Sequence, residues 1–151
     1  MAVRLTWAQR EQIVAQARAE APNECCGMLL GRGDTVEEVF PGRNVDGTPR
    51  TRYELDPHDQ LRAFRLMDER GWGLVAIYHS HPQTEPKPSK TDKVLAMYPD
   101  ARYVIVSLRD PADPQVRAWR ILEKTDGDGK PVVDEGGHAV KTELEEEVLV
   151  T

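Results

Sequence analysis

Two of the four histidines in this chain, His79 and His81, stand two positions apart at the end of an apolar run. In an extended strand, residues i and i+2 point to the same side. Both imidazoles can therefore converge on one ion, and imidazole is a ligand that suits zinc, copper, iron and nickel. For an isolated pair, two surface histidines beside a turn are the ordinary alternative.

A short loop after His81 leads to Ser89 and Asp92, and residues 82–88 contain three prolines that stiffen it. Ser-x-x-Asp alone is an ordinary pattern at a helix start, where the charge of the aspartate suits the helix dipole. A rigid return of the chain also makes Asp92 a candidate third ligand. Two His and one Asp are the three protein ligands typical of a catalytic zinc, with the fourth position left for water.

Hydrolysis at such a metal needs a general base for the water proton and a donor for the developing oxyanion. Glu24 is the candidate base, because a charged residue at the start of a strongly apolar strand is unusual unless it faces a cleft. A surface glutamate at the edge of a strand is the alternative. Ser89, which lies close to a ligand in the sequence, is the candidate donor.

Apolar runs bounded by turn residues predict the strands that must position these groups. The most apolar runs are expected to form the middle of a sheet, and they are residues 25–30, 74–78 and 103–108. Further strands are expected at residues 36–40, 52–55 and 116–122, and one more in the tail that begins at residue 132.

Capping residues and apolar periodicity predict three helices. The first begins after Thr6, with Gln9 as its capping-box partner, and ends at Pro22. The second and third are expected at residues 56–71 and 89–97. The stripes expected to be buried are Ile13, Val14 and Ala17 in the first helix, and Leu61, Phe64 and either Met67 or Asp68 in the second. A mixed sheet flanked by about three short helices is an α/β (α+β) fold.

The length of 151 residues predicts one domain, residues 1–151. The net charge of −6 disfavours a nucleic-acid partner, because phosphates demand a basic face. No apolar run approaches the ~18 residues that span a bilayer, and the first residues turn polar too early for a signal peptide. We therefore expect a cytoplasmic protein with no membrane partner. The acidic residues 143–147 are expected to form a solvated face or a frayed end.

Cys25 and Cys26 are adjacent, so they indicate no disulfide framework. In a strand they would point to opposite sides, which predicts that each is a small buried hydrophobic residue. A cysteine protease that pairs Cys26 with His79 or His81 is an alternative. A metal site is preferred because it uses the same histidines and also explains the Ser-x-x-Asp pattern.

Glu24, then His79-Ser-His81-Pro, then Ser89-x-x-Asp92 resembles the signature of the JAMM (MPN-plus) zinc peptidases. Each of the five functional positions is filled at the family's spacing, which is far stronger evidence than an isolated His-x-His. The similarity covers most of residues 5–122, whereas the tail from residue 132 lies outside it. The short chain is most similar to the compact bacterial branch, which includes peptidases that trim a cysteine from a sulphur-carrier protein.

The resemblance implies a single JAMM/MPN-like domain with one catalytic Zn²⁺ bound by His79, His81 and Asp92. It also implies that Glu24 is the general base that later protonates the leaving amine. Ser89 would help to hold the catalytic water and would polarise the oxyanion.

The implied reaction is hydrolysis of the bond after the C-terminal Gly-Gly of a ubiquitin-like sulphur-carrier protein, with release of cysteine or a short extension, in cysteine biosynthesis or sulphur transfer. The alternatives are removal of ubiquitin-like modifiers from proteins and a non-catalytic MPN-type interaction module. An iron oxygenase ranks last, because the order of its ligands along the chain differs. Arg50 and Arg52 are candidates to neutralise a substrate carboxylate, although surface arginines are more often solvated.

Overall fold

In the computed structural model, which describes residues 2–151, the three most apolar runs form adjacent strands, as predicted. They are β2 (Cys26–Arg32), β4 (Gly73–His81) and β5 (Arg102–Ser107). β2 runs antiparallel to β4, and β4 runs parallel to β5. The side chains of these strands are almost all buried, which explains why their sequences read as continuous apolar runs.

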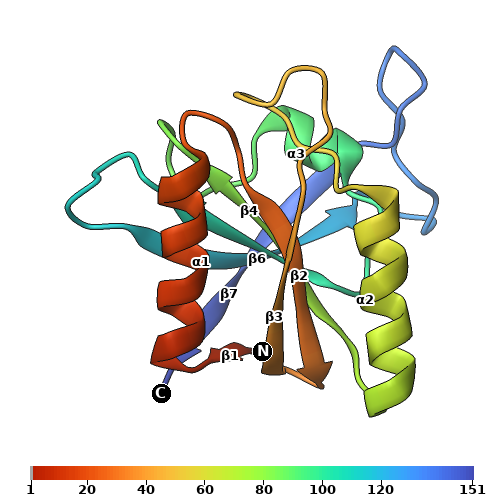
Figure 1. Ribbon diagram of the computed structural model, residues 1–151. Helices are drawn as coiled ribbons and strands as arrows, with labels where there is room; N and C mark the ends of the chain where they lie inside the picture. Colours follow the sequence, from red (N-terminus) through yellow and green to blue (C-terminus); the bar gives the residue numbers. More distant parts are fainter. Residues whose placement is uncertain (1) are drawn as a thin grey trace.

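Four further strands close this sheet into a barrel, in the order β1-β3-β2-β4-β5-β6-β7 (Figure 1). They are β1 (Ala2–Leu5), β3 (Thr35–Gly42), β6 (Gln115–Glu123) and β7 (Lys141–Val150). β1 was not expected from the sequence. It pairs in parallel with β7, so the barrel joins the first and last described segments of the chain.

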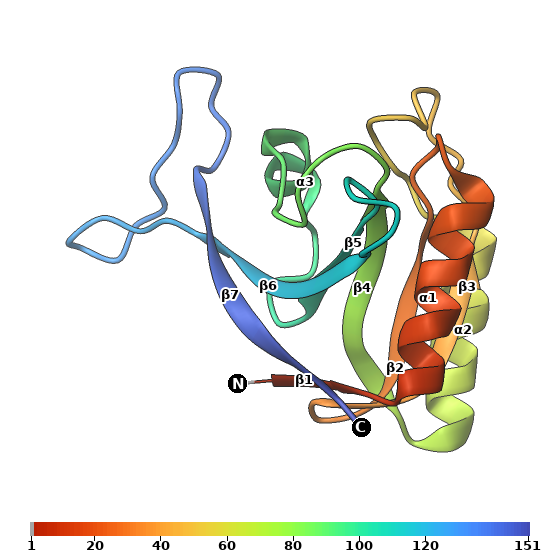
Figure 2. The same ribbon diagram turned by 90° about the vertical axis from the view of Figure 1, so that its left-hand side faces the viewer.

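The acidic tail forms strand β7, so of the two alternatives predicted for residues 143–147 the frayed end is wrong. The solvated face is confirmed at Glu145 and Glu147, which are exposed. β7 pairs with β6 on one side and with β1 on the other, and Glu146 is buried. The strand predicted from residue 132 begins only at Lys141. The segment between β6 and β7 projects away from the barrel (Figure 2).

Helix α1 (Trp7–Glu20) begins as predicted, with Thr6 and Gln9 in a reciprocal capping box. Its apolar stripe is also confirmed, since Ile13, Val14 and Ala17 are buried. These residues pack into one core cluster with Leu29 of β2 and with residues of β1, β5 and β6.

Helix α2 (Pro57–Arg70) begins after the predicted cap, Asp56. Of the stripe predicted for it, Met67 is buried, but the prediction is wrong for Leu61 and Phe64. Leu61 is 49% exposed and Phe64 is 38% exposed. The buried face is formed by Asp59, Ala63 and Met67, which are also helix-spaced. The sequence of α2 thus offers two helix faces that could be buried. The face that carries Ala63 and Met67 is the buried one, because these residues pack against β2.

α1 and α2 cover opposite faces of β2 and β3 (Figure 1). Cys25 packs in the cluster on the side of α1, whereas Cys26 packs in the cluster on the side of α2. The prediction that the adjacent cysteines face opposite ways is thus confirmed, and both are free and buried.

Helix α3 (Lys90–Leu95) is shorter than the predicted 89–97. The backbone N–H groups of Met97 and Tyr98 donate to the hydroxyl of Tyr103, each at 3.0 Å, instead of continuing the helix.

The strand predicted at residues 52–55 is absent from the described residues, apart from a single bridge between Asn44 and Leu55. The side chain of Asn44 takes up backbone groups that a strand would use. Its amide donates to the carbonyl of Arg52 at 3.0 Å, and its oxygen accepts from the N–H of Glu54 at 3.1 Å.

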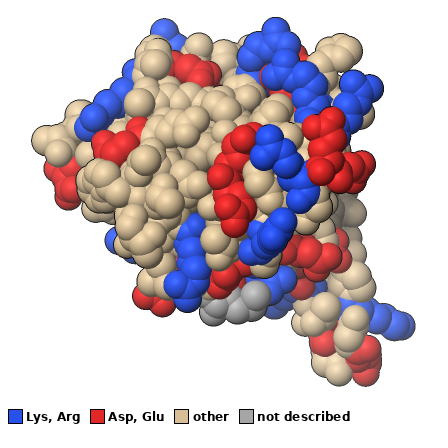
Figure 3. Space-filling view, turned by 60° about the horizontal axis from the view of Figure 1, so that its bottom comes forward, with Lys and Arg blue, Asp and Glu red and all other residues tan. Residues whose placement is uncertain are grey.

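No helix within residues 2–151 is long and apolar enough to cross a membrane. On the face shown in Figure 3, Lys and Arg side chains are interspersed with Asp and Glu side chains.

The close approach of β2 and β3 at Gly31 yields a testable prediction. A Cβ at Gly31 would overlap the carbonyl oxygen of Thr35 and lie 2.8 Å from the amide nitrogen of Glu37, and both are backbone atoms. We expect Gly31→Ala to lower the free energy of unfolding by about 1–3 kcal/mol, measured by urea denaturation. Gly73 is its cross-strand partner and has nothing within 4 Å of a built Cβ. Gly73→Ala is therefore the matched control, and an equal loss in both variants would contradict the argument.

Candidate metal centre and active site

The strand order brings the separate parts of the sequence motif to one end of the barrel. Because β4 is antiparallel to β2, the end of β4 lies beside the start of β2, and His79 is opposite Cys26. α3 begins at the same end (Figure 1). His79 and His81 come from the end of β4, Glu24 precedes β2, and Asp92 lies in the first turn of α3.

Three buried ligand atoms form a cluster of metal-binding dimensions. Nε2 of His79 lies 3.1 Å from Nε2 of His81 and 3.1 Å from Oδ2 of Asp92, and Nε2 of His81 lies 2.9 Å from the same oxygen. Bonds of about 2.0–2.1 Å to a tetrahedral zinc would place such atoms about 3.3 Å apart. These three residues could therefore hold one metal ion, as predicted.

The electrostatics of the cluster favour an anionic Asp92. Burial by itself would raise the pKa of Asp92, but His79 and His81 and the N–H of Ser89 outweigh it and hold the pKa far below its usual range. Burial would lower the pKa of His81, but the hydrogen bond and charge of Asp92 outweigh this and raise it. His81 therefore keeps its proton up to a higher pH than an ordinary histidine does.

Contacts behind the histidines fix their orientation. Nδ1 of His81 lies 2.8 Å from the carbonyl oxygen of Glu85, so Nδ1 carries a hydrogen and Nε2 is left for a metal. The ring of Tyr53 stacks on His79, with centroids 4.4 Å apart. Tyr53 was not identified from the sequence, because it lies in the loop before α2 and only the fold brings it to β4.

Ser89 caps α3 and holds Asp92 at the same time. Its hydroxyl accepts from the N–H of Asp92 at 3.0 Å, and its own N–H donates to Oδ2 of Asp92 at 2.9 Å. The helix-capping interpretation of Ser-x-x-Asp is thus confirmed, and it does not compete with the ligand interpretation. The same carboxylate oxygen that accepts from Ser89 faces both imidazoles.

Glu24 is buried, with an exposed fraction of only 4%. Its Oε1 has no hydrogen-bond partner among residues 2–151. Burial raises the pKa of Glu24 to about 8, and the negative charge of Asp92 adds to the effect. A solvated surface glutamate is therefore excluded. A buried, unpartnered carboxyl beside a cation site has the properties of a general base.

Ser80, between the two histidines, is a positioning residue that sequence reasoning missed. The N–H of Cys25 donates to Oγ of Ser80 at 2.8 Å, and the N–H of Ser80 donates to the carbonyl of Cys25 at 3.1 Å. These two bonds hold Cys25, which follows Glu24 in the chain, against Ser80, which lies between His79 and His81. Side chains alternate between the two faces of a strand, so Ser80 must face away from His79 and His81. This alternation was the signal in the sequence that could have identified Ser80.

A pocket of about 420 Å³ opens onto this cluster. Glu24, His81 and Ser89 line it together with Arg50, and residues 82–84 of the proline-rich loop form part of its wall. Arg52, the other arginine singled out from the sequence, lines a different pocket and lies 3.7 Å from Asp46.

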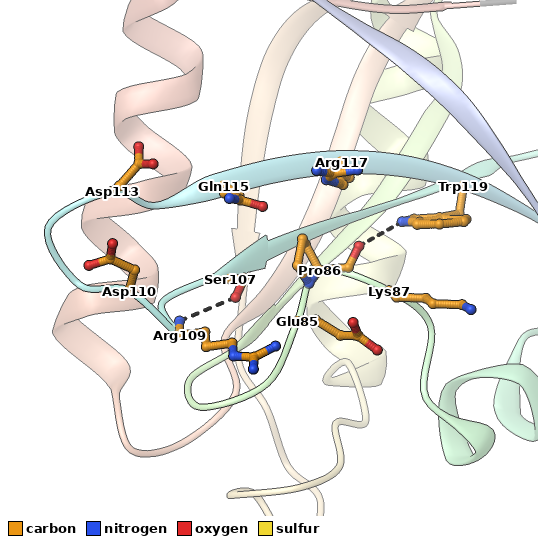
Figure 4. Close-up of a pocket in the computed structure, with 10 residues that line it drawn as sticks. All are labelled: Glu85, Pro86, Lys87, Ser107, Arg109, Asp110, Asp113, Gln115, Arg117 and Trp119. Carbon is orange, nitrogen blue, oxygen red and sulfur yellow. Dashed lines mark hydrogen bonds between the residues drawn. The ribbon is translucent and has the colours of Figure 1, made fainter.

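The far side of the proline-rich loop faces another pocket, of about 560 Å³, which none of the five motif residues lines (Figure 4). Here Nε1 of Trp119 donates to the carbonyl of Pro86 at 2.9 Å, and the hydroxyl of Ser107 donates to the carbonyl of Thr84 at 2.5 Å. With the contact between His81 and Glu85, these bonds hold the loop rigidly between the two pockets.

The complete burial of Cys25 and Cys26 argues against a cysteine nucleophile. Burial raises the pKa of Cys25 to about 12 and raises that of Cys26 further still. A reactive cysteine requires the opposite shift, towards the thiolate. The preference for a metal site over a cysteine protease is therefore supported.

Comparison with known proteins identifies the family. Residues 8–122 match the family described as prokaryotic homologs of the JAB domain. This chain belongs to the JAB family. The resemblance to JAMM (MPN-plus) peptidases inferred from the motif is thereby confirmed.

Relatives within this family are similar over most of their length. The CysO-cysteine peptidase of Mycobacterium tuberculosis is 44% identical over 113 residues, which are 74% of this chain and 77% of that protein. The desampylase of Haloferax volcanii is 39% identical over 104 residues, or 65% of this chain and 75% of that protein. The solution structure of a protein from Desulfitobacterium hafniense, 35% identical, has a TM-score of 0.79 and covers 100% of this chain and 93% of that one.

Metal binding is predicted to weaken as the pH falls. The raised pKa of His81 means that its imidazole is protonated up to a higher pH than usual, and metal binding must then displace that proton. We expect zinc affinity to fall about tenfold for each pH unit below this pKa, and to level off above it. Competition with a fluorescent chelator between pH 5.5 and 8 measures the profile. His58→Gln, at an exposed histidine, should leave it unchanged, and pH-independent binding would contradict the prediction.

Ser80→Ala is predicted to separate positioning from metal binding. The buried N–H of Cys25 loses its acceptor, which should cost about 1–3 kcal/mol of stability. Because Ser80 faces away from the ligand cluster, the zinc content should match that of the wild type. Urea denaturation and elemental analysis measure the two quantities. Loss of zinc without loss of stability would refute the assigned role.

Proposed function

We propose that this chain is a zinc-dependent peptidase of the JAMM type that cleaves the bond after the C-terminal Gly-Gly of a ubiquitin-like sulphur-carrier protein. The released product would be cysteine or a short extension. The observation that carries the proposal is that Glu24, His81 and Ser89 line one pocket, and that His81 also belongs to the cluster of ligand atoms with His79 and Asp92. The name of the mycobacterial relative, CysO-cysteine peptidase, supports the choice of substrate.

His79, His81 and Asp92 would hold the zinc, since their donor atoms have the chemistry and spacing that zinc prefers. When bound, zinc supplies a Lewis acid that makes hydroxide available at neutral pH and polarises a carbonyl.

Glu24 would move the proton of the reaction. Its buried carboxylate accepts a proton from the attacking water as the new C–O bond forms at the carbonyl of the last glycine. It then gives this proton to the leaving nitrogen as the C–N bond breaks. The acid proton that remains on the new glycine carboxyl group passes to the amine, so that the final products are a glycine carboxylate and an ammonium group. The raised pKa of Glu24, about 8 before the charge of a metal is added, suits a group that must both accept and return a proton near neutral pH.

Ser89 would stabilise the oxyanion. Its oxygen already accepts from the N–H of Asp92, which leaves the hydroxyl hydrogen free to donate into the pocket. A donor held by a helix cap is preorganised, and this is the property that makes such donors effective in catalysis.

The pocket walls fit a slender, extended substrate tail. Residues 82–84 of the proline-rich loop and Arg50 and Thr51 of the loop before α2 line the pocket together with Glu24. A tail that ends in Gly-Gly has no side chains at this point and can lie close to such walls. We place the reaction in the cytoplasm, where sulphur-carrier proteins would be available. The alternative function is removal of ubiquitin-like modifiers from proteins, and the similarity to the desampylase is the observation that supports it.

Glu24→Gln is predicted to abolish turnover without removing the metal. Loss of the general base should lower the rate about 10²–10⁴-fold, whereas zinc content should stay at one ion because Glu24 is not a ligand. The substrate is CysO, the ubiquitin-like sulphur-carrier protein after which the mycobacterial relative is named, prepared with one cysteine after a C-terminal Gly-Gly. The loss of that cysteine is measured by intact mass.

Glu37→Gln is the matched control, because Glu37 is exposed on β3. It should cleave at the wild-type rate. Equal rates for Glu24→Gln and wild type would overturn the role of Glu24, and no cleavage by the wild type would overturn the proposed substrate.

A further inference from the structure

The pocket above Glu24 contains one permanent positive charge. Among the described residues that line it, Arg50 is the single Lys or Arg, and the remaining polar groups are mainly hydroxyls. The side chain of Arg50 is exposed and forms no ion pair or hydrogen bond with residues 2–151. Its guanidinium is therefore available to a ligand, unlike that of Arg52, which faces Asp46.

The turn that carries Arg50 is fastened to the backbone of the proposed base. The N–H of Glu24 donates to the carbonyl of Pro49 at 2.8 Å, and the amide of Asn44 donates to the carbonyl of Glu24 at 3.0 Å. The turn itself is closed by the N–H of Arg52, which donates to the carbonyl of Thr48 at 3.1 Å. Arg50 thus starts from a fixed point beside Glu24, although its side chain is free.

The chemistry of the leaving group decides which part of the substrate the guanidinium of Arg50 could bind. When one residue with a free C-terminus follows Gly-Gly, its carboxylate carbon lies about 2.5 Å from the nitrogen of the cleaved bond, by standard backbone dimensions. Proton transfer places this nitrogen at Glu24. A second anion must then enter a pocket already lined by a carboxyl group, and it needs a partner of opposite charge.

Resting on the proposed function, we propose that Arg50 binds the α-carboxylate of the released residue and selects substrates with a single free-acid residue after Gly-Gly. A guanidinium matches a carboxylate in a two-pronged hydrogen-bonded pair. The leaving group of an isopeptide-linked conjugate is a lysine side chain, which carries no carboxylate near its nitrogen. Arg50 therefore favours trimming of a carrier over removal of a modifier from a protein.

The experiment compares two CysO substrates that differ only in the C-terminal group, which is a carboxylate in one and a carboxamide in the other. One ends in Gly-Gly-Cys with a free acid and the other in Gly-Gly-cysteine amide. The wild type should cleave the acid with the higher kcat/KM. Arg50→Gln should lower kcat/KM for the acid about 10- to 100-fold, the range expected for a charged hydrogen bond, and should leave the amide unchanged. Arg52→Gln is the matched control and should keep the wild-type ratio of acid to amide.

A binding measurement on the zinc-loaded protein provides a readout that does not depend on turnover. In isothermal titration calorimetry, free cysteine should bind more tightly than cysteine amide, and Arg50→Gln should remove this difference. Unfolding midpoints and zinc content equal to wild type would confirm that the variant is intact.

The possible failures are distinguishable. If the wild type cleaves neither substrate, the proposed function and the role of Arg50 fall together. If it cleaves acid and amide equally, or if Arg50→Gln keeps the preference, only the role of Arg50 is overturned. If Arg50→Lys keeps the preference for the acid and Arg50→Gln loses it, recognition of the carboxylate by positive charge is confirmed.

Discussion

The site depends on one buried carboxylate oxygen, Oδ2 of Asp92. It lies within 3.1 Å of both imidazole nitrogens and also accepts the N–H of Ser89. A buried charge is costly unless it is paired and hydrogen-bonded. The chain must therefore hold the start of α3 against the end of β4, and a metal ion or a proton must sit between the ligands. The fold at this end of the barrel is organised around that requirement.

Two loops complete the arrangement. The loop before α2 supplies Tyr53 behind His79, clamps the backbone of Glu24 through Asn44, and presents Arg50 to the pocket. The proline-rich loop after β4 orients His81 through the carbonyl of Glu85. Hydrogen bonds from side chains to backbone carbonyl groups hold both loops in place. The pocket is therefore largely preformed. β7 adds a brace, since Glu143 lies 2.8 Å from Lys93 of α3.

Much of the fold was predictable because its signals are local. Capping residues located the starts of all three helices, and the most apolar runs located the central strands. The face that α2 buries was not predictable, since Leu61 and Ala63 belong to alternative helical phases and only the sheet surface selects between them. β1 was missed for a similar reason, because a short strand gains its stability from pairing with β7 rather than from its own composition.

The sequence by itself predicted the five candidate residues of the site, because their types and spacing match a ligand set, a base and an oxyanion donor. Only the tertiary structure decided that these groups meet, that Glu24 is buried without a partner, and that Ser80 fixes the distance between the two strands. It also separated Arg50 from Arg52, which are close in sequence but line different pockets. The physical reason is that burial and hydrogen-bond partners come from contacts distant in the chain, which local pattern does not record.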